Sequence, residues 1–419
     1  MPLRERLALA HSALRTVCVT GTNGKTTTTS LIAAIVQASR ERSARITTVG
    51  AWLDGVKIAQ DHTPEAFATA VDRAVEAGVK TIAIETTSKA LGVGFAHAWS
   101  AQVAVFTNLS RDHLDYHATP EQYLAAKAQL FITLPPGGVA VLNACDPVSA
   151  LIAEVCPPDV KILGFAVDEP APECAMIRVA LQAASVEVRT DGTAVQLAPS
   201  ALANSLGGRL ALRVLGDVHV GNAMAAAVAA HVLGYSASAI VRGLQEFPGV
   251  PGRFEVVGRE PLVVVDYAHT PDALVKSLQL ARRFAGGGDV MVPVGAKDPA
   301  RVICVFGCGG ERDRGKRPEM GRAVAYGADV AVLTTDNPRG EDPSRIADDV
   351  MRGVEGGGAR WVWEPDRTRA IRTAIAMAES PGDVVLIAGK GHETEQLLGD
   401  GMVPFSDGDV ARAACLTRG

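Results

Sequence analysis

The sequence predicts an α/β protein built on parallel sheets, and three observations carry that prediction. Short apolar runs rich in Val and Ile alternate with longer helical patterns over most of the chain, which is typical of parallel sheets covered by helices. A glycine-rich turn joins the first of these runs to the first helical stretch. Residues 177–214 instead alternate polar and apolar residues around an Asp-Gly turn, which indicates antiparallel strands. We therefore expect a parallel sheet with a small antiparallel sheet, followed by a second α/β domain.

The first domain is predicted to span residues 1–250. Its expected elements are a strand at 16–20, helices at 25–39 and 64–78, strands at 81–85 and 102–107, a helix at 120–130 and a strand at 139–143. The stretch 186–192 predicts a hairpin, because alternating residues lead into Asp-Gly. Two helices are expected to follow, at 220–233 and 236–245.

The second domain is predicted to span residues 251–419, because Pro-Gly-Val-Pro-Gly at 248–252 is a turn-rich break. Strands are expected at 262–266, 302–306, 330–334, 361–363 and 384–388, with helices between most of them. Residues 286–300 look inserted before the strand at 302, and the sequence gives them no role.

Composition excludes several classes of protein. The chain has 419 residues, of which 47% are hydrophobic and 21% charged, so it has enough apolar surface for large cores. A net charge of -5 argues against a nucleic-acid partner. No apolar run is long enough to span a membrane, and the N-terminus lacks a signal-peptide core. The 7 cysteines form no CxxC pair, so we expect free thiols in a reducing cytoplasm. The sequence does not give the oligomeric state, and a monomer is the favoured expectation.

Residues 21–27, Gly-Thr-Asn-Gly-Lys-Thr-Thr, lie between a predicted strand and a predicted helix. In such a loop the backbone N–H groups converge on phosphate, and the helix N-terminus adds positive charge. Lys25 is placed to contact the terminal phosphates and Thr26 to reach Mg²⁺. The predicted nucleotide-binding residues are Gly21, Thr22, Asn23, Gly24, Lys25, Thr26 and Thr27. The first domain is thus predicted to be a P-loop-type ATPase domain that uses ATP and Mg²⁺.

Polar residues follow two further strands. Glu85 ends the strand at 81–85, where a carboxylate can hold Mg²⁺ or, equally, cap a helix. Residues 106–117 gather Asn, Arg, Asp and His in one loop. Lys127 stands in an otherwise apolar helical stretch. From this residue alone, a side chain that extends to solvent is the simpler interpretation.

Together these segments resemble the Mur ligase family, the ATP-dependent amide-forming enzymes of peptidoglycan synthesis. The resemblance runs from about residue 16 to the C-terminus. It is carried by residues 21–27, Glu85, 107–117, 125–127, Asn222, 252–255 and 266–274. The second domain is then expected to be a Rossmann-like domain that binds an amino acid.

The resemblance implies roles for several residues. Lys127 would be carbamylated and would bind one Mg²⁺ together with His113, while Thr26 and Glu85 would bind another. Asn222 would contact adenine. Arg253 and Asp266 would contact the rest of ATP, and His269 is a candidate catalytic residue without a fixed role.

Within the family, the chain most resembles the members that add diaminopimelate or lysine to the stem peptide. Three stretches carry this likeness, at 309–318, 336–343 and 389–393. By analogy, Arg312 and Arg339 would hold the distal carboxylate of diaminopimelate, since Arg suits carboxylates. The other residues assigned to substrates are Thr63, Ser88, Asp336, Asn337, Gly389 and Glu393. Surface charge is the alternative explanation for the two arginines.

Two departures from the family concern the acceptor. Only about fifteen residues precede the first strand, so we expect the family's N-terminal UDP-binding domain to be absent. In the loop at 86–95, Lys89, Val93 and Phe95 stand where the tripeptide synthetases have His, Gln and Arg. These changes favour a small-molecule acceptor acid that is not a UDP-muramoyl peptide. The alternatives are the authentic UDP-muramoyl-dipeptide ligase with a truncated start, and a non-catalytic nucleotide-binding subunit.

The family mechanism implies that ATP activates an acceptor carboxylate as an acyl phosphate, with release of ADP. The amine of the amino acid then attacks the acyl carbon and phosphate leaves. Most of the catalysis would come from positioning and from neutralising charge on the transferred phosphoryl group.

Overall fold

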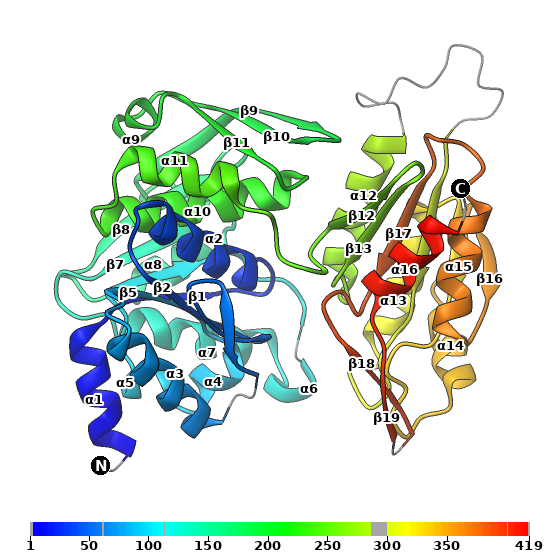
Figure 1. Cartoon of the computed structure of the whole chain (residues 1–419), viewed down its shortest axis with the longest axis horizontal. Helices are drawn as coiled ribbons and strands as arrows, with labels where there is room; N and C mark the ends of the chain where they lie inside the picture. The colour runs from blue at the N-terminus through cyan, green and yellow to red at the C-terminus, as the bar shows by residue number, and fades with distance from the viewer. Residues whose placement is uncertain (1–2, 61–62, 113, 286–299, 400, 418–419) are drawn as a thin grey trace. The chain divides into compact units, whose positions relative to one another are not determined.

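A computed structural model describes residues 3–60, 63–112, 114–285, 300–399 and 401–417. The chain divides into two compact units (Figure 1). The first unit comprises residues 1–110 and 116–248, and the second comprises 111–115 and 249–419. Each unit has its own sheet and its own helices, and each is described by itself below.

The sheet of the first unit has 11 described strands in the order β11-β10-β9-β8-β7-β6-β1-β5-β2-β3-β4. Its centre is parallel, and consists of β1 (Arg15–Thr20), β2 (Ser43–Thr47), β5 (Thr81–Glu85), β6 (Val103–Phe106), β7 (Val139–Asn143) and β8 (Lys161–Ala166). The apolar runs of β1, β5 and β6 are buried on both faces, as expected for a parallel sheet covered by helices. The strands predicted at 16–20, 81–85, 102–107 and 139–143 agree with these bounds within one residue, whereas β2 and β8 were not predicted.

Both edges of this sheet are antiparallel. One edge is β3 (Gly50–Leu53) and β4 (Val56–Ala59), which the sequence analysis missed because the two strands are short. The other edge is β9 (Val179–Arg189), β10 (Gly192–Leu197) and β11 (Arg209–Leu212). The hairpin predicted at 186–192 is confirmed, with Arg189 opposite Gly192. These strands extend the main sheet, because β9 pairs with β8.

Helices cover both faces of the first sheet (Figure 1). On one face lie α2 (Lys25–Ala38), α10 (Asp217–Val232) and α11 (Ala237–Glu246). On the other lie α1 (Leu3–Ala13), α3 (Pro64–Glu76), α7 (Pro120–Ile132) and α8 (Val148–Glu154). The shorter helices are α4 (Ser88–Gly92), α5 (Phe95–Ala98), α6 (Leu114–His117) and α9 (Ala201–Ser205), with a 3₁₀ turn at Pro172–Cys174. The sequence analysis did not predict α1, α8 or the short helices.

The second unit is built on a six-stranded sheet in the order β12-β13-β17-β14-β15-β16. Its strands are β12 (Glu255–Arg259), β13 (Leu262–Asp266), β14 (Val302–Phe306), β15 (Val330–Leu333), β16 (Arg360–Trp363) and β17 (Val384–Ala388). All pairs are parallel except β12 with β13. The five strands predicted here are confirmed. The segment 286–299, most of the inserted stretch noted in the sequence, lies outside the described residues.

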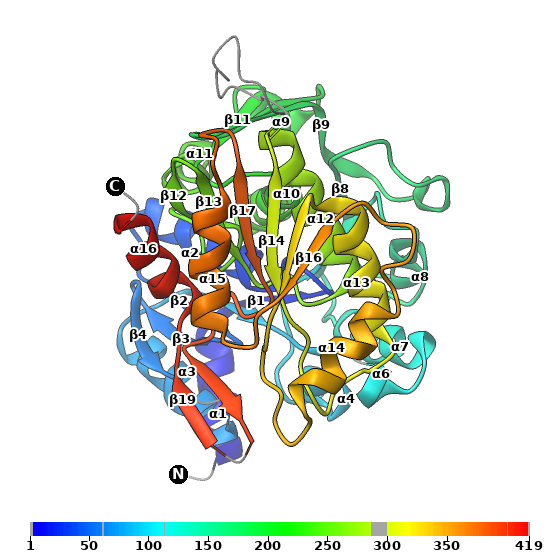
Figure 2. The same ribbon diagram turned by 90° about the vertical axis from the view of Figure 1, so that its right-hand side faces the viewer.

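Helices also cover both faces of the second sheet (Figure 2). On one face lie α12 (Pro271–Ala285), α13 (Lys316–Gly327) and α14 (Pro343–Met351), and on the other α15 (Arg367–Met377) and α16 (Asp407–Leu416). A separate hairpin consists of β18 (Glu395–Leu398) and β19 (Gly401–Pro404).

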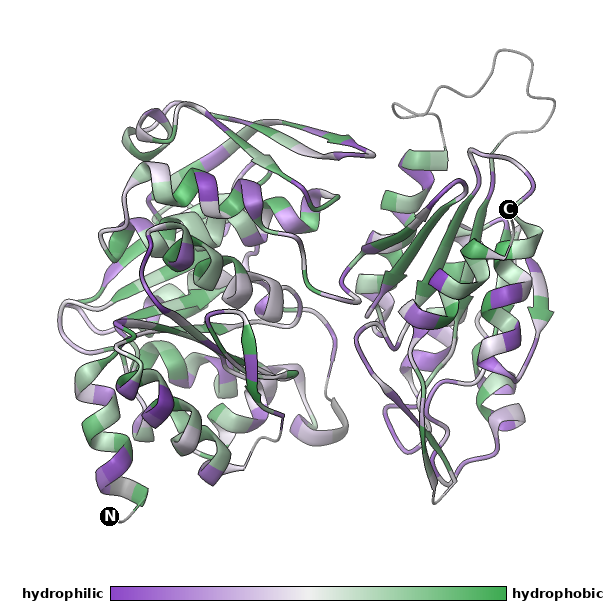
Figure 3. Cartoon of the chain, in the orientation of Figure 1, coloured by the Kyte–Doolittle hydropathy of each residue, from purple (hydrophilic) through white to green (hydrophobic). Residues whose placement is uncertain are grey.

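The hydropathy pattern explains this layering. The strands of both sheets are mainly hydrophobic, whereas polar residues gather on the outer helical faces (Figure 3). The fold class predicted from the sequence is therefore confirmed. All 7 cysteines are free. Across the described residues, no helix combines the length and the apolar character needed to cross a membrane.

Candidate active site

The phosphate loop connects β1 to α2, as the sequence predicts. Gly21 and Gly24 have φ of 147° and 86°, values that side chains disfavour. A Cβ on Gly21 would overlap the Thr107 hydroxyl, and a Cβ on Gly24 would overlap the Asn222 side chain. Both glycines are therefore required by backbone conformation and by close packing.

The loop that follows β6 holds the phosphate loop in place. The Thr22 amide donates to the Asn108 carbonyl at 2.8 Å, and the Asn23 amide donates to Asn108 Oδ1 at 2.9 Å. Thr107 Oγ1 donates to the Asn23 carbonyl at 2.6 Å. The polar stretch after β6, which the sequence marked as a ligand loop, thus supports the phosphate loop from behind.

Lys25 and Lys127 approach the same loop. Lys25 Nζ donates to the Thr22 carbonyl at 2.8 Å, and Lys127 Nζ donates to the Gly21 carbonyl at 2.7 Å. Lys127 Nζ also lies 4.1 Å from the centroid of the Tyr123 ring. The Lys127 side chain is 1% exposed, so the interpretation that it extends to solvent is wrong. The structure brings the two amines to neighbouring carbonyls.

Glu85 lies beside the start of α2. Thr26 Oγ1 donates to Glu85 Oε2 at 2.8 Å. Thr48, just after β2, donates its amide to Oε2 at 3.1 Å and its hydroxyl to Oε1 at 3.2 Å. Glu85 therefore does not cap a helix. The sequence analysis missed Thr48, because only the pairing of β2 with β5 brings it close.

Asn222 also reaches the phosphate loop, from α10. Its Oδ1 accepts a hydrogen bond from Thr28 Oγ1 at 3.3 Å and lies against Gly24. Sequence spacing alone could not place it there, since it comes 194 positions after Thr28.

In the second unit, three loops follow the neighbouring strands β17, β14 and β15, as the sequence analysis expected. Carboxyl ends of parallel strands share one edge of a sheet, and the loops touch there. Arg339 Nη1 donates to the Gly310 carbonyl at 2.8 Å and to the Asn337 carbonyl at 3.3 Å. The Gly310 amide donates to the Asn337 carbonyl at 2.9 Å. Arg339 is thus part of the loop structure, which argues against simple surface charge.

A buried lysine connects two of these loops. Lys390 is fully buried, and its Nζ donates to Asn337 Oδ1 at 2.9 Å and to Glu393 Oε2 at 2.8 Å. Asn337 Nδ2 also donates to Glu393 Oε2, at 2.9 Å. Lys390 stands in the stretch 389–393 but received no role from the sequence. The structure, and not the sequence, shows that Lys390 is buried beside the Glu393 carboxylate.

A second cation stabilises the loops that follow β14 and β15. Arg317 is 1% exposed and pairs with Glu341 and Asp349 at 2.9 Å each. It also donates to the Gly309 carbonyl at 3.1 Å. Hydrogen bonds from Arg317 hold the pKa of Glu341 down at about 2.

The end of β17 is fixed by a further buried pair. The side chains of Arg367 and Asp407 are both 0% exposed and lie 2.7 Å apart. Arg367 Nη2 also donates to the Ala388 carbonyl at 3.0 Å, directly before Gly389. Gly389 has φ of 114°, which suits glycine at this turn.

The motif at 266–274 forms a stacked cluster. Asp266 accepts from the Phe254 amide at 3.1 Å and from Ser277 Oγ at 2.5 Å, and burial raises its pKa. Arg253 stacks on Tyr267, with its guanidinium carbon 4.3 Å from the ring centroid. His269 Nδ1 lies 2.8 Å from the Tyr267 carbonyl, and burial lowers the pKa of His269 to about 4. His269 is therefore neutral at neutral pH.

Of the remaining predicted residues, Thr63 and Ser88 lie in the first unit, and Asp336 and Arg312 lie in the strand-end loops of the second unit. Thr63 is exposed and caps α3, accepting from the Ala66 amide at 3.1 Å. Ser88 is buried, 2.9 Å from His117 Nε2. Asp336 accepts from the Asn337 amide at 2.7 Å, and Arg312 is exposed. His113 lies outside the described residues, and its metal role stays a prediction.

The fold and these contacts define an enzyme that binds a nucleoside triphosphate on one α/β unit and carries a cluster of charged loops on another. Comparison with known proteins makes this specific. Residues 19–230 match the model of the Mur ligase middle domain, and residues 252–391 match that of the Mur ligase, glutamate ligase domain. The chain belongs to the Mur ligase family.

Comparison with individual relatives supports this family assignment. The chain is 40% identical over 418 residues to the UDP-N-acetylmuramoyl-L-alanyl-D-glutamate–2,6-diaminopimelate ligase of Geobacillus thermodenitrificans, covering 97% of this chain and 79% of that one. A solved structure of a ligase of the same name has a TM-score of 0.65 at 34% identity, covering 99% and 81% of the two chains. The Mycobacterium tuberculosis folylpolyglutamate synthase shares the fold, with a TM-score of 0.69 at 19% identity over 99% and 93%.

The chain is thus an ATP-dependent, ADP-forming acid–amino-acid ligase that uses ATP with Mg²⁺. The non-catalytic alternative raised from the sequence is wrong.

Proposed function

We propose that the chain joins 2,6-diaminopimelate to UDP-N-acetylmuramoyl-L-alanyl-D-glutamate. The single observation that supports this is 40% identity to a ligase of that name over 97% of the chain. The comparisons favour this acceptor over the expectation, drawn from the loop at 86–95, that the acceptor is not a UDP-muramoyl peptide.

In this proposal the first unit binds ATP. Because the Thr22 and Asn23 amides are bonded to Asn108, the phosphates would lie at the N-terminus of α2. Lys25 would exchange its contact with the Thr22 carbonyl for the terminal phosphate. The oxygens of Thr26 and Glu85, 2.8 Å apart, fit Mg²⁺, which prefers a few hydroxyl or carboxylate ligands alongside phosphate and water. Bound Mg²⁺ neutralises charge on the phosphates.

Lys127 has a further role in the proposal, as a carbamate. Its buried amine lies against the phosphate loop, where a cation alone would add to the positive charge of Lys25. A carbamate would convert this position to an anionic oxygen ligand for a second Mg²⁺, with His113 as its partner.

The reaction then follows the order of an acyl-phosphate ligase. A carboxylate oxygen of the acceptor attacks the terminal phosphorus of ATP, the bond to ADP breaks, and an acyl phosphate forms. The amine of diaminopimelate attacks the acyl carbon, loses a proton, and inorganic phosphate leaves. The chain contributes by holding the reacting groups in line and by stabilising the charge.

The second unit supplies the proposed diaminopimelate pocket. Arg312 and Arg339 are suited to its distal carboxylate, and Glu393 to an ammonium group. Because Lys390 already bonds one oxygen of Glu393, the other oxygen remains for the substrate.

The test is ADP release by the purified chain with UDP-N-acetylmuramoyl-L-alanyl-D-glutamate and meso-diaminopimelate. We expect release to require both substrates, and L-lysine to replace diaminopimelate poorly. No release with this acceptor, together with release with another carboxylic acid, would contradict the proposal.

A further inference from the structure

A cavity of about 170 Å³ lies in the first unit, at the carboxyl ends of β2 and β5. Its walls come from these two strands, from β3 and β4, and from α3, α4 and α5. They are formed by Ile46, Thr47, Thr48, Gly50, Ala51, Ala59, Ala66, Phe67, Ala70, Ile84, Glu85, Thr86, Thr87, Ala90 and Phe95. None of the residues to which the nucleotide or the amino acid has been assigned lines it, except Glu85.

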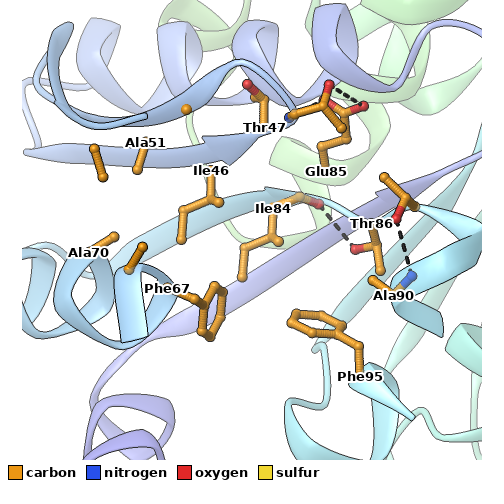
Figure 4. Close-up of a pocket in the computed structure, with 15 residues that line it drawn as sticks. Ile46, Thr47, Ala51, Phe67, Ala70, Ile84, Glu85, Thr86, Ala90 and Phe95 are labelled. Atoms are coloured by element: carbon orange, nitrogen blue, oxygen red, sulfur yellow. Dashed lines mark hydrogen bonds between the residues drawn. The ribbon is translucent and has the colours of Figure 1, made fainter. Parts of the chain in front are cut away.

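Most of the cavity is apolar. Ile46 and Ile84 point from the sheet toward the rings of Phe67 and Phe95 (Figure 4). These two rings meet edge to face, with centroids 5.6 Å apart. Both phenylalanines remain partly exposed, although an aromatic ring gains by burial. A group bound in the cavity would cover the exposed parts of these two rings.

The threonine side chains of the wall each have a hydrogen-bond partner within the protein. Thr47 accepts from the Val49 amide, Thr48 donates to Glu85, Thr86 donates to the Ile84 carbonyl, and Thr87 accepts from the Ala90 amide. Among the described residues, Glu85 is the one charged side chain in the cavity wall. An anionic group entering the cavity would lose water and meet the Glu85 carboxylate, so the wall favours an aliphatic group over an acidic one.

The location of Glu85 connects the cavity to the chemistry. Glu85 is hydrogen-bonded to Thr26 of the phosphate loop, so one end of the cavity adjoins the place where the acceptor carboxylate must meet ATP. The occupant is therefore a part of the acceptor close to its reacting carboxyl. In the proposed acceptor, the residue next to the reacting D-glutamate is L-alanine.

We infer that this cavity binds the aliphatic side chain of the acceptor's first amino acid. The inference rests on the proposed acceptor and extends it to specificity. A cavity of about 150 Å³ holds a benzene ring, so the space exceeds a methyl group. The enzyme is therefore built to accept a larger aliphatic residue, such as valine, in place of alanine.

Filling the cavity tests the inference. In Ala70→Leu and Ala90→Leu, added methyl groups take the space of the acceptor side chain. We expect the KM for the acceptor to rise about tenfold or more, with the KM values for ATP and diaminopimelate unchanged. Ala98→Leu is the matched control, because Ala98 is exposed and does not line the cavity. Unchanged acceptor KM in both variants, with melting temperatures like the wild type, would overturn the inference.

A second measurement uses the unmodified enzyme and covers the case in which the variants do not fold. Acceptors with L-valine or L-aspartate replacing L-alanine are compared with the parent acceptor. Valine should be used about as well as alanine, and aspartate at least about a hundredfold worse in kcat/KM. Equal use of aspartate and valine would overturn the inference alone. No turnover of the parent acceptor would instead overturn the proposed function.

Discussion

The phosphate loop of the first unit and the three strand-end loops of the second unit occupy equivalent positions, at the carboxyl ends of parallel strands, but they are stabilised differently. The phosphate loop is held by backbone groups and short polar side chains, such as Asn108 and Thr107. The loops of the second unit are held by buried cations, Lys390, Arg317 and Arg367.

From this difference we expect some substitutions to change the reaction rate and others to change the structure of the loops. In the first unit, charged side chains can be removed without loss of the loop's main supports, so their effects should report on the reaction. In the second unit, some charged side chains do not themselves contact a substrate. They hold in place the side chains that are proposed to contact it. Removing one leaves a buried partner uncompensated.

The largest effect is expected from Lys25→Ala. Removing the amine takes away charge stabilisation at the transferred phosphoryl group, and the rate of ADP release should fall about a thousandfold. The melting temperature should stay near the wild-type value, because the hydrogen bonds that join the loop to Asn108 and Thr107 do not involve the Lys25 side chain. A large drop in melting temperature would contradict the claim that the phosphate loop keeps its structure without its charged side chain.

Lys127→Ala should lower kcat about a hundredfold, the size of effect seen when metal sites lose supporting groups. Carbamylation is checked directly by ¹³C NMR after equilibration with labelled bicarbonate. The wild type should show a carbamate carbon signal that Lys127→Ala lacks. Full activity of the variant, or no difference between the two spectra, would exclude a carbamate at this position.

Lys390→Met should raise the KM for the amino acid about thirtyfold, because it leaves Glu393 without its buried cation and removes one of the hydrogen bonds that hold Asn337. The KM for ATP should not change. Lys276→Met is the control, since Lys276 is a half-exposed lysine of the same unit whose ion pair with Asp272 lies at the surface. Equal effects of the two variants on the amino-acid KM would contradict a positioning role for Lys390.

The smallest effect concerns acid stability. The pKa of Glu341 is lowered to about 2 from its ordinary 4.5 by Arg317. Its contribution to stability is therefore complete above pH 4.5 and is lost as the pH falls toward 2. Glu341→Gln should melt at a lower temperature than the wild type at about pH 7, with the difference shrinking as the pH falls from about 4.5 to about 3. A difference that is independent of pH over this range would show that the ion pair is not its source.

Local pattern predicted the strands that are buried on both faces and most of the longer helices of the first unit. Buried strands such as Leu262–Asp266 and Val302–Phe306 were placed correctly, because both faces of a parallel strand must be apolar. The short strands Gly50–Leu53 and Val56–Ala59 were not predicted. They are partly exposed, so neither forms an apolar run long enough to mark a strand. The Gly-Lys-Thr loop could be recognised from the sequence alone, because its glycines, lysine and threonine are close together along the chain.

Residues close together along the chain were therefore enough to predict the buried strands, the phosphate loop and the family motifs. Three contacts are visible only in the folded chain: Lys127 is buried against Gly21, Thr48 bonds Glu85, and Lys390 joins Asn337 to Glu393. These contacts link distant segments, and their strength comes from burial. Burial is a property of the packed chain and not of any single stretch of it.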